Sequence, residues 1–141
     1  MPTQESPDLM GLINEKYSIL HRRREAMWAT TGLVPVTVTE WHVLSRVRDG
    51  SSSISEVARA VNISRQATHK CIRSLQDKGI LTVDTHPDNR RNRVVSMTDF
   101  GHLCYAQNLA FRLEVEQQVE ASIGAEQLCL LKDILDKIPP E

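Results

Sequence analysis

Apolar residues recur at helical spacing along most of the chain, which predicts a mainly α-helical protein. The first such segment begins after Ser6, a residue type that caps helices, and is expected to stop at Gly32. Pro7 would occupy the first helical position, where its missing N–H costs nothing. The helical period is carried by Leu9, Leu12, Ile13, Tyr17 and Leu20.

Three shorter helices are predicted next, each marked by a capping residue. Thr37 with Glu40, and Ser53 with Glu56, have the spacing of a capping box. Asn62 stands where a left-handed residue would turn the chain into a further helix, which Ser64 caps and Gly79 ends. Buried positions are expected at Ile54, Val57, Ala58 and Val61, and then at Thr68, Cys71, Ile72 and Leu75.

The second half of the chain changes from strand-like to helical patterns. Two short segments rich in β-branched residues, 80–85 and 94–97, frame a polar stretch and predict a hairpin. Two helices are expected after it, over 98–122 and 124–138. The last one carries an apolar stripe broader than a surface helix requires, at Leu128, Leu130, Leu131, Ile134, Leu135 and Ile138.

Charge is distributed unevenly along the 141 residues, although 17 basic and 18 acidic side chains nearly cancel. Residues 59–93 carry eight basic and three acidic side chains, whereas residues 102–141 carry three basic and seven acidic ones. No acidic residue lies between Glu56 and Asp77. This asymmetry indicates a polyanionic partner for the middle segment alone.

Several classes of protein are disfavoured by the same sequence. No apolar run approaches the length of a membrane span, and the N-terminus lacks the features of a signal peptide, so a cytoplasmic protein is expected. Three widely spaced cysteines suit free thiols. Because no nucleophile elbow, phosphate loop or complete metal motif occurs, we expect no enzyme, no cofactor and no metal site.

Residues 53–78 have the order helix, tight turn, helix, which is the spacing of a helix-turn-helix. Polar side chains occupy the second helix outside its apolar stripe, where Arg and Lys could reach guanine edges or phosphates and Gln could pair with adenine. An ordinary solvated helix face is the alternative. The predicted DNA-binding residues on this helix are Ser64, Arg65, Gln66, His69, Lys70 and Arg73.

The polar stretch between the two strand-like segments predicts a wing. Three arginines in four residues would concentrate positive charge at a hairpin tip, which suits a narrow minor groove. Asp88 could brace Arg90 through a charge-assisted hydrogen bond. The expected DNA-binding residues of the wing are therefore Asp88, Arg90, Arg91 and Arg93.

From Thr37 to Gly101 the chain resembles the MarR family of winged helix-turn-helix transcriptional regulators. The resemblance is carried by Ser55-Glu56-Val57-Ala58, by Asp88-Asn89-Arg90 and by Met97-Thr98-Asp99-Phe100-Gly101. It implies one MarR-like domain over 1–141, mainly α, with a winged helix-turn-helix lobe of three helices and a small β-hairpin at 37–97. The N- and C-terminal helices, 6–31 and 98–138, would form the dimer. The chain departs from the family at Thr82-Val83-Asp84, where arginine is usual, and at Thr68 and Cys71, where larger apolar residues are usual.

The resemblance also implies a function. A homodimer would bind double-stranded DNA at a pseudo-palindromic operator and act as a repressor relieved by a small, often aromatic, ligand. A winged-helix module that binds proteins rather than DNA is the alternative function, and an intramolecular bundle is the alternative to the dimer. The residues expected near a ligand are His21, Arg24, Trp28, Trp41 and His42.

Two further readings of these residues are open. Trp28 and Trp41 could simply fill the junction between the lobe and the dimer helices. His42 resembles in position a ligand of zinc-sensing members, but Asn108 and Arg112 stand near the place where partner histidines are expected. No cysteine lies in the first helix, where peroxide-sensing members place theirs, so a thiol switch is not expected.

Overall fold

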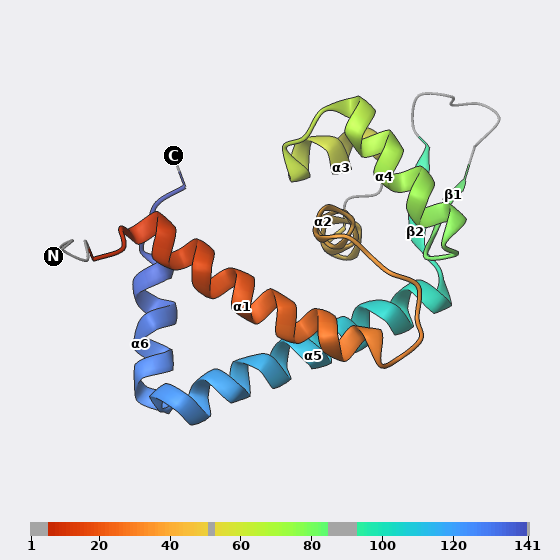
Figure 1. Cartoon of the computed structure of the whole chain (residues 1–141). Coiled ribbons are helices and arrows are strands. Elements are labelled where there is room, and N and C mark those ends of the chain that lie inside the picture. Colours follow the sequence, from red (N-terminus) through yellow and green to blue (C-terminus); the bar gives the residue numbers. More distant parts are fainter. Residues whose placement is uncertain (1–5, 51–52, 85–92, 141) are drawn as a thin grey trace, which may run out of the picture. The chain divides into compact units, whose positions relative to one another are not determined.

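A computed structural model describes residues 6–50, 53–84 and 93–140, which form two compact units (Figure 1). The winged unit comprises residues 32–107, and the helical unit comprises the chain up to residue 31 together with residues from 108 onward. In chain order the elements are α1 (Leu9–Ala29), α2 (Val38–Arg48), α3 (Ile54–Val61), α4 (Arg65–Asp77), β1 (Leu81–Asp84), β2 (Val94–Met97), α5 (Asp99–Ile123) and α6 (Ala125–Asp136). Helix α5 contributes to both units.

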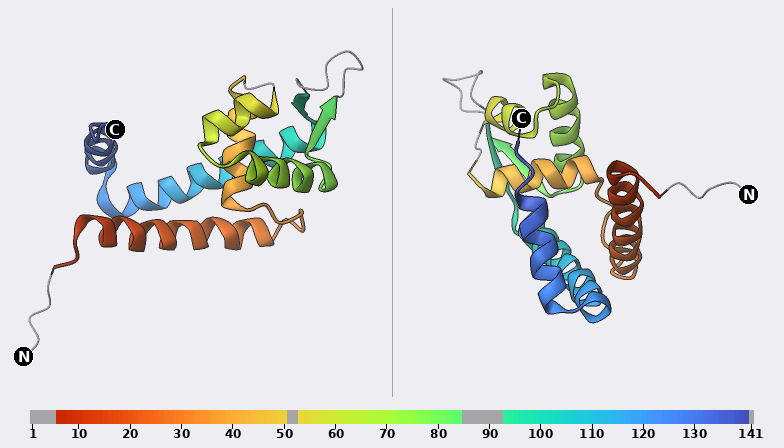
Figure 2. Two further views of the ribbon diagram at one scale, coloured as in Figure 1. Left: turned by 90° about the horizontal axis from the view of Figure 1, so that it is seen from above. Right: turned by 90° about the vertical axis from the view of Figure 1, so that its left-hand side faces the viewer.

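In the winged unit, α2, α3 and α4 pack on one another and the β1–β2 hairpin lies against α2 and α4 (Figures 1 and 2). The strands are antiparallel, with Leu81 opposite Met97 and Asp84 opposite Val94. Ser53 adds a bridge to Val94, which ties the start of α3 to the hairpin. The centre of the unit is filled by fully buried side chains, among them Val43, Leu44, Val57, Ile72, Leu75 and Ile80. The predicted winged helix-turn-helix fold is confirmed.

Three of the predicted helix starts are formed as expected. Thr37 and Glu40 make a reciprocal capping box: the Glu40 N–H donates to the Thr37 hydroxyl (3.1 Å) and the Thr37 N–H to the Glu40 carboxylate (3.2 Å). Ser53 accepts from the Glu56 N–H, and Ser64 from the Ala67 N–H, each at 3.1 Å. These caps satisfy backbone donors that the first turn of a helix leaves without partners.

The turn and the end of α4 also follow the sequence prediction. Asn62 has a left-handed backbone with φ of 58°. At the end of α4 the Ile80 N–H donates to the Leu75 carbonyl and the Gly79 N–H to the Gln76 carbonyl, both at 2.9 Å. This pair of bonds is the Schellman motif, and Gly79 supplies its left-handed position with φ of 73°.

Helix α1 begins two residues later than predicted. Its cap is Asp8, whose carboxylate accepts the Gly11 N–H at 2.7 Å, and the helix runs from Leu9. The prediction that Ser6 caps this helix with Pro7 in first position was therefore wrong. A carboxylate is a charged acceptor that the positive end of the helix dipole favours over a hydroxyl.

The helical unit leaves many apolar side chains uncovered. Helix α6 has no buried residue, and α1 exposes Met10 to 82%. The exposed large apolar residues of this unit are Leu9, Met10, Leu12, Ile13, Tyr17, Leu109, Leu113, Ile123, Leu130, Leu131, Ile134, Leu135 and Ile138. The single chain therefore does not bury the apolar stripes of α1 and α6, as the alternative of an intramolecular bundle would require.

None of the described helices is long and apolar enough to cross a lipid bilayer.

Candidate nucleic-acid interface

Helix α4 separates its polar and apolar side chains cleanly. Thr68, Ile72 and Leu75 are buried at positions three or four apart, which places them on one face of the helix. The side chains predicted to bind DNA are all exposed: Ser64, Arg65, Gln66, His69, Lys70 and Arg73. The structure therefore presents this set to solvent while the opposite face anchors the helix.

The unusual Thr68 fits the core without an unpaired hydroxyl. Its side chain is fully buried, and its hydroxyl donates to the Ser64 carbonyl at 2.9 Å, one turn earlier in the helix. The methyl group is then the part that faces the core. The departure from a larger apolar residue thus costs packing volume but no hydrogen bond.

The base of the wing contributes a further basic side chain near α4. Arg93 lies just before β2 and lines a hollow of about 140 Å³ together with His69 and Arg73 of α4. Ile54, Ile72, Gln76 and Val83 complete its walls. Three predicted DNA-binding residues, two from α4 and one from just before the wing's second strand, are thereby brought together. The other three wing residues, Asp88, Arg90 and Arg91, lie outside the described residues.

A partly buried ion pair connects α2 to the end of α4, and sequence reasoning missed it. The Glu40 carboxylate accepts from the Lys78 ammonium at 2.8 and 2.9 Å and from the Ser74 hydroxyl at 3.3 Å. Glu40 is only 3% exposed. Its second role beside the capping box was not visible locally, because Lys78 follows 38 residues later. The pair fixes where α4 ends relative to α2.

Two thiols of the winged unit have pKa values raised above that of a free cysteine. Cys71 is half-buried, and its pKa is raised mainly by burial and also by the nearby Glu40 carboxylate. Burial alone raises the pKa of Cys104, a fully buried residue of α5. Both shifts reduce the thiolate fraction at neutral pH.

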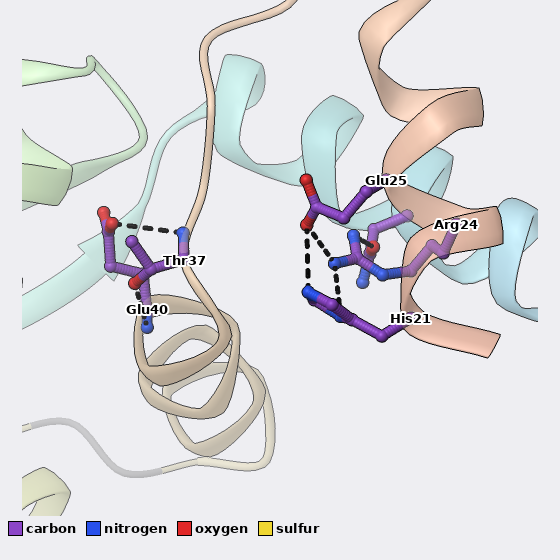
Figure 3. A network of polar contacts seen from close by, with 6 residues as sticks. His21, Arg24, Glu25, Thr37 and Glu40 are labelled. Atoms are coloured by element: carbon purple, nitrogen blue, oxygen red, sulfur yellow. Dashed lines mark hydrogen bonds and ion pairs between the residues drawn. The ribbon is translucent and has the colours of Figure 1, made fainter. Parts of the chain in front are cut away.

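Three of the candidate ligand residues belong to the helical unit, and one of them, Arg24, is held by hydrogen bonds to neighbouring side chains. Arg24 is 7% exposed, and its guanidinium donates to the Asn108 side-chain oxygen (2.8 Å) and to Glu25 (2.6 Å) (Figure 3). His21 lies 3.5 Å from the same guanidinium. Asn108 was noted in the sequence only for what it replaces, and its role as the Arg24 acceptor required the tertiary structure.

The aromatic candidates divide between core and surface. Trp28 is buried and makes an edge-to-face contact with Phe111, with ring centroids 6.4 Å apart. In the winged unit Trp41 is buried whereas His42 is exposed. Within the described ranges no three His, Cys, Asp or Glu side chains gather as a metal site would require.

Comparisons with known proteins place this geometry in context. A family profile described as winged helix-turn-helix DNA-binding matches residues 44–82, from within α2 to β1. The transcriptional regulator AdcR of Streptococcus pneumoniae is 31% identical over 93 residues, which are 65% of this chain and 62% of AdcR. The match thus spans less than two thirds of that relative.

Solved structures share the fold over nearly the full length. The reduced form of MarR from E. coli superposes with a TM-score of 0.76 at 21% identity, covering 97% of this chain and 100% of MarR. A MarR-family protein of Mycobacterium tuberculosis, solved with salicylic acid, gives 0.69 at 22% identity, covering 96% and 98%. BpsR of Bordetella bronchiseptica, studied for regulation of its DNA binding by 6-hydroxynicotinic acid, gives 0.63 at 21%, covering 90% and 98%. The resemblance predicted from the sequence is confirmed, and the chain has the winged helix-turn-helix fold of the MarR family.

Proposed function

We propose that the chain is a sequence-specific DNA-binding transcription regulator that acts as a homodimeric repressor. The observation that carries this proposal is the exposed face of α4, where Arg65, His69, Lys70 and Arg73 gather without a carboxylate among them. A helix of this kind, anchored on its other face, is suited to enter a major groove and read base edges.

The match to a DNA-binding winged-helix profile supports the same function, and AdcR of Streptococcus pneumoniae is itself called a transcriptional regulator. Arg93 beside α4 extends the basic surface toward the wing. Phosphate contacts from such arginines would position the protein, and contacts from α4 to bases would specify the site.

The exposed apolar residues of the helical unit support dimerisation through it. Stripes on α1 and α6 would leave large apolar surface in water unless a second copy covers them. A two-fold dimer presents two copies of α4 to successive major grooves, about 34–36 Å apart. The operator is therefore expected to be pseudo-palindromic.

Release by a small aromatic acid completes the proposal. The support is that one structural relative was solved with salicylic acid and that DNA binding of another is regulated by 6-hydroxynicotinic acid. In the helical unit the candidate contact residues are His21 and Trp28. Arg24 takes part only if a ligand competes with Asn108 and Glu25 for its guanidinium.

Fluorescence anisotropy with duplex DNA tests the central claim. Random duplex at low salt should bind the full chain, and selection from genomic fragments should enrich a pseudo-palindrome. Negligible binding to every duplex would favour the protein-interaction module instead. Addition of salicylate or 6-hydroxynicotinate should release the selected duplex if the ligand proposal holds, and unchanged binding with both would contradict it for these two acids.

Substitution of Gln66 tests whether α4 reads sequence. Gln66→Ala removes an exposed amide that can pair with adenine, so base preference should relax at one position per half-site, by about 1–3 kcal/mol against the wrong base. Gln118→Ala, on the exposed surface of α5, is the matched control. An identical selected site for both variants would show that Gln66 is not a reader.

A further inference from the structure

A second hollow lies at the helix-turn-helix turn and contains an arginine that the recognition helix does not include. Arg59 is exposed in the last turn of α3. It lines a hollow of about 380 Å³ together with Ser55, Ala58, Asn62, Ile63 and Arg65. Arg65 is the first residue of α4, so the hollow joins the two helices of the motif.

The turn brings these two arginines to one place. Asn62, with φ of 58°, ends α3 in a left-handed conformation, and Ser64 then starts α4 after only two more residues. Ala58 is 6% exposed and small enough for the helices to pack closely. Side chains six residues apart therefore reach the same hollow from different helices.

The chemistry of the hollow suits an anion. Two arginines, Arg59 and Arg65, line it together with Ser55 and Asn62, whose side chains can also donate hydrogen bonds. None of the described residues that line it is Asp or Glu. Guanidinium groups bind phosphate through paired hydrogen bonds, which an ammonium group cannot match in geometry.

The start of α4 adds a further attraction for negative charge. Ser64 caps the Ala67 N–H, and the N–H groups of Arg65 and Gln66 belong to the first turn, which has no intrahelical acceptors for them. The helix dipole directs its positive end to the same region.

We propose that this hollow binds one phosphate of the DNA backbone and that Arg59 is a DNA-contact residue together with Arg65. The inference rests on the proposed function, because it assumes that α4 lies in a major groove. In this arrangement the residues of α4 have separate roles. Arg65 contacts the DNA backbone beside the major groove, and Gln66, His69 and Lys70 contact the bases. Arg59 sets the position of the helix without specifying sequence.

The test is a salt titration of the full chain on its selected duplex. Arg59→Ala should weaken binding about equally on the selected site and on sites with one changed base pair, and should reduce the slope of log affinity against log salt by about one. Arg59→Lys should keep most of the slope but bind more weakly than the wild type. Arg46→Ala, an exposed arginine of α2 outside the hollow, removes the same charge as a control.

Coupling between the two arginines distinguishes a shared phosphate from two separate contacts. If Arg59 and Arg65 bind one phosphate, the loss in the double alanine variant should differ from the sum of the single losses. Thermal unfolding by circular dichroism checks that each variant is folded.

Losses that simply add in the double variant would contradict the shared phosphate, and two further results would overturn the inference as a whole. In the first, the wild-type chain binds DNA, but Arg59→Ala has the same affinity and the same salt slope as the control variant Arg46→Ala. This result leaves the proposed function intact. The other is a wild-type chain that binds no duplex at any salt concentration, which removes the proposed function as well.

Discussion

Gly101 shows how a single position allows the winged unit to close. A Cβ at this position would lie 2.6 Å from the Met97 Cγ and would overlap the Ile80 carbonyl oxygen. Thr98 completes the junction: its N–H donates to the Ile80 carbonyl at 2.9 Å, and its hydroxyl accepts the Gly101 N–H at 2.9 Å. The Thr-x-x-Gly motif seen in the sequence is therefore the place where α5 starts against the backbone that leads into β1.

Gly101→Ala is expected to destabilise the protein by about 1–3 kcal/mol or more, because the added methyl group has no space. In an unobstructed helix the same change would stabilise by up to about 1 kcal/mol. Urea unfolding followed by circular dichroism decides between the two signs. A higher midpoint for the variant would mean that the close approach to Ile80 is absent.

Cys104 should resist alkylation in the folded protein. It is fully buried, and burial raises its pKa, so both access and the thiolate fraction are low. Its thiolate fraction can grow only as pH rises toward that higher pKa, so iodoacetamide at pH 8 should label it only after unfolding in urea. Mass spectrometry of the peptides reads this out. Rapid labelling of Cys104 without denaturant would contradict its burial.

At the scale of the elements, local and distant contacts act together on α4. Its two ends are set by bonds between residues close in sequence, the Ser64 cap and the Gly79 turn. Its direction is set by the Glu40–Lys78 ion pair and by the packing of Ile72 and Leu75. A recognition helix needs both, because its side chains can read bases only when the helix axis is held.

Lys78→Met is expected to lower the free energy of unfolding by about 3 kcal/mol, since it leaves the buried Glu40 carboxylate without its cation. Adding Glu40→Gln should recover part of this loss in a double-mutant cycle. Chemical denaturation measures both.

The exposed pair formed by Lys132 and Glu116 is the matched control. Lys132→Met should change stability little, because solvent screens that pair. Equal effects of Lys78→Met and Lys132→Met would show that the Glu40 pair does not stabilise the winged unit.

At the scale of the whole molecule, the charge of the chain and its apolar surface divide between the two units. The basic side chains of 59–93 lie in the winged unit, and the acid-rich segment and the uncovered apolar stripes lie largely in the helical unit. This separation suits a molecule that binds a polyanion with one part and a second copy of itself with the other.

Leu131→Glu should weaken the proposed dimer, because it places a charge among exposed apolar residues of α6 that a second copy would bury. Sedimentation equilibrium should show a dissociation constant raised at least tenfold. Thr39→Glu, on the exposed surface of α2, is the control. A wild-type chain that sediments as a monomer, or a Leu131→Glu variant that dimerises as tightly as wild type, would contradict dimerisation through α6.

The sequence by itself determined the features that depend on near neighbours. The Thr37–Glu40 capping box, the Ser53 and Ser64 caps, the left-handed Asn62 and the Gly79 helix end each involve residues within five positions, so their geometry follows from residue type and spacing. Ser6 was the exception, because Asp8 offered a stronger acceptor two residues later. The helical periods and the uneven charge also depend on residue type and spacing, and they predicted a winged helix-turn-helix.

Only the tertiary structure decided which distant side chains meet. Lys78 reaches Glu40 across 38 residues, Asn108 reaches Arg24 across 84, and Arg93 lies beside His69 and Arg73 of α4. Arg59 and Arg65 share a hollow because of the angle between two helices, which periodicity does not specify. Such contacts depend on how faces pack, and packing is a property of the assembled core rather than of any one segment.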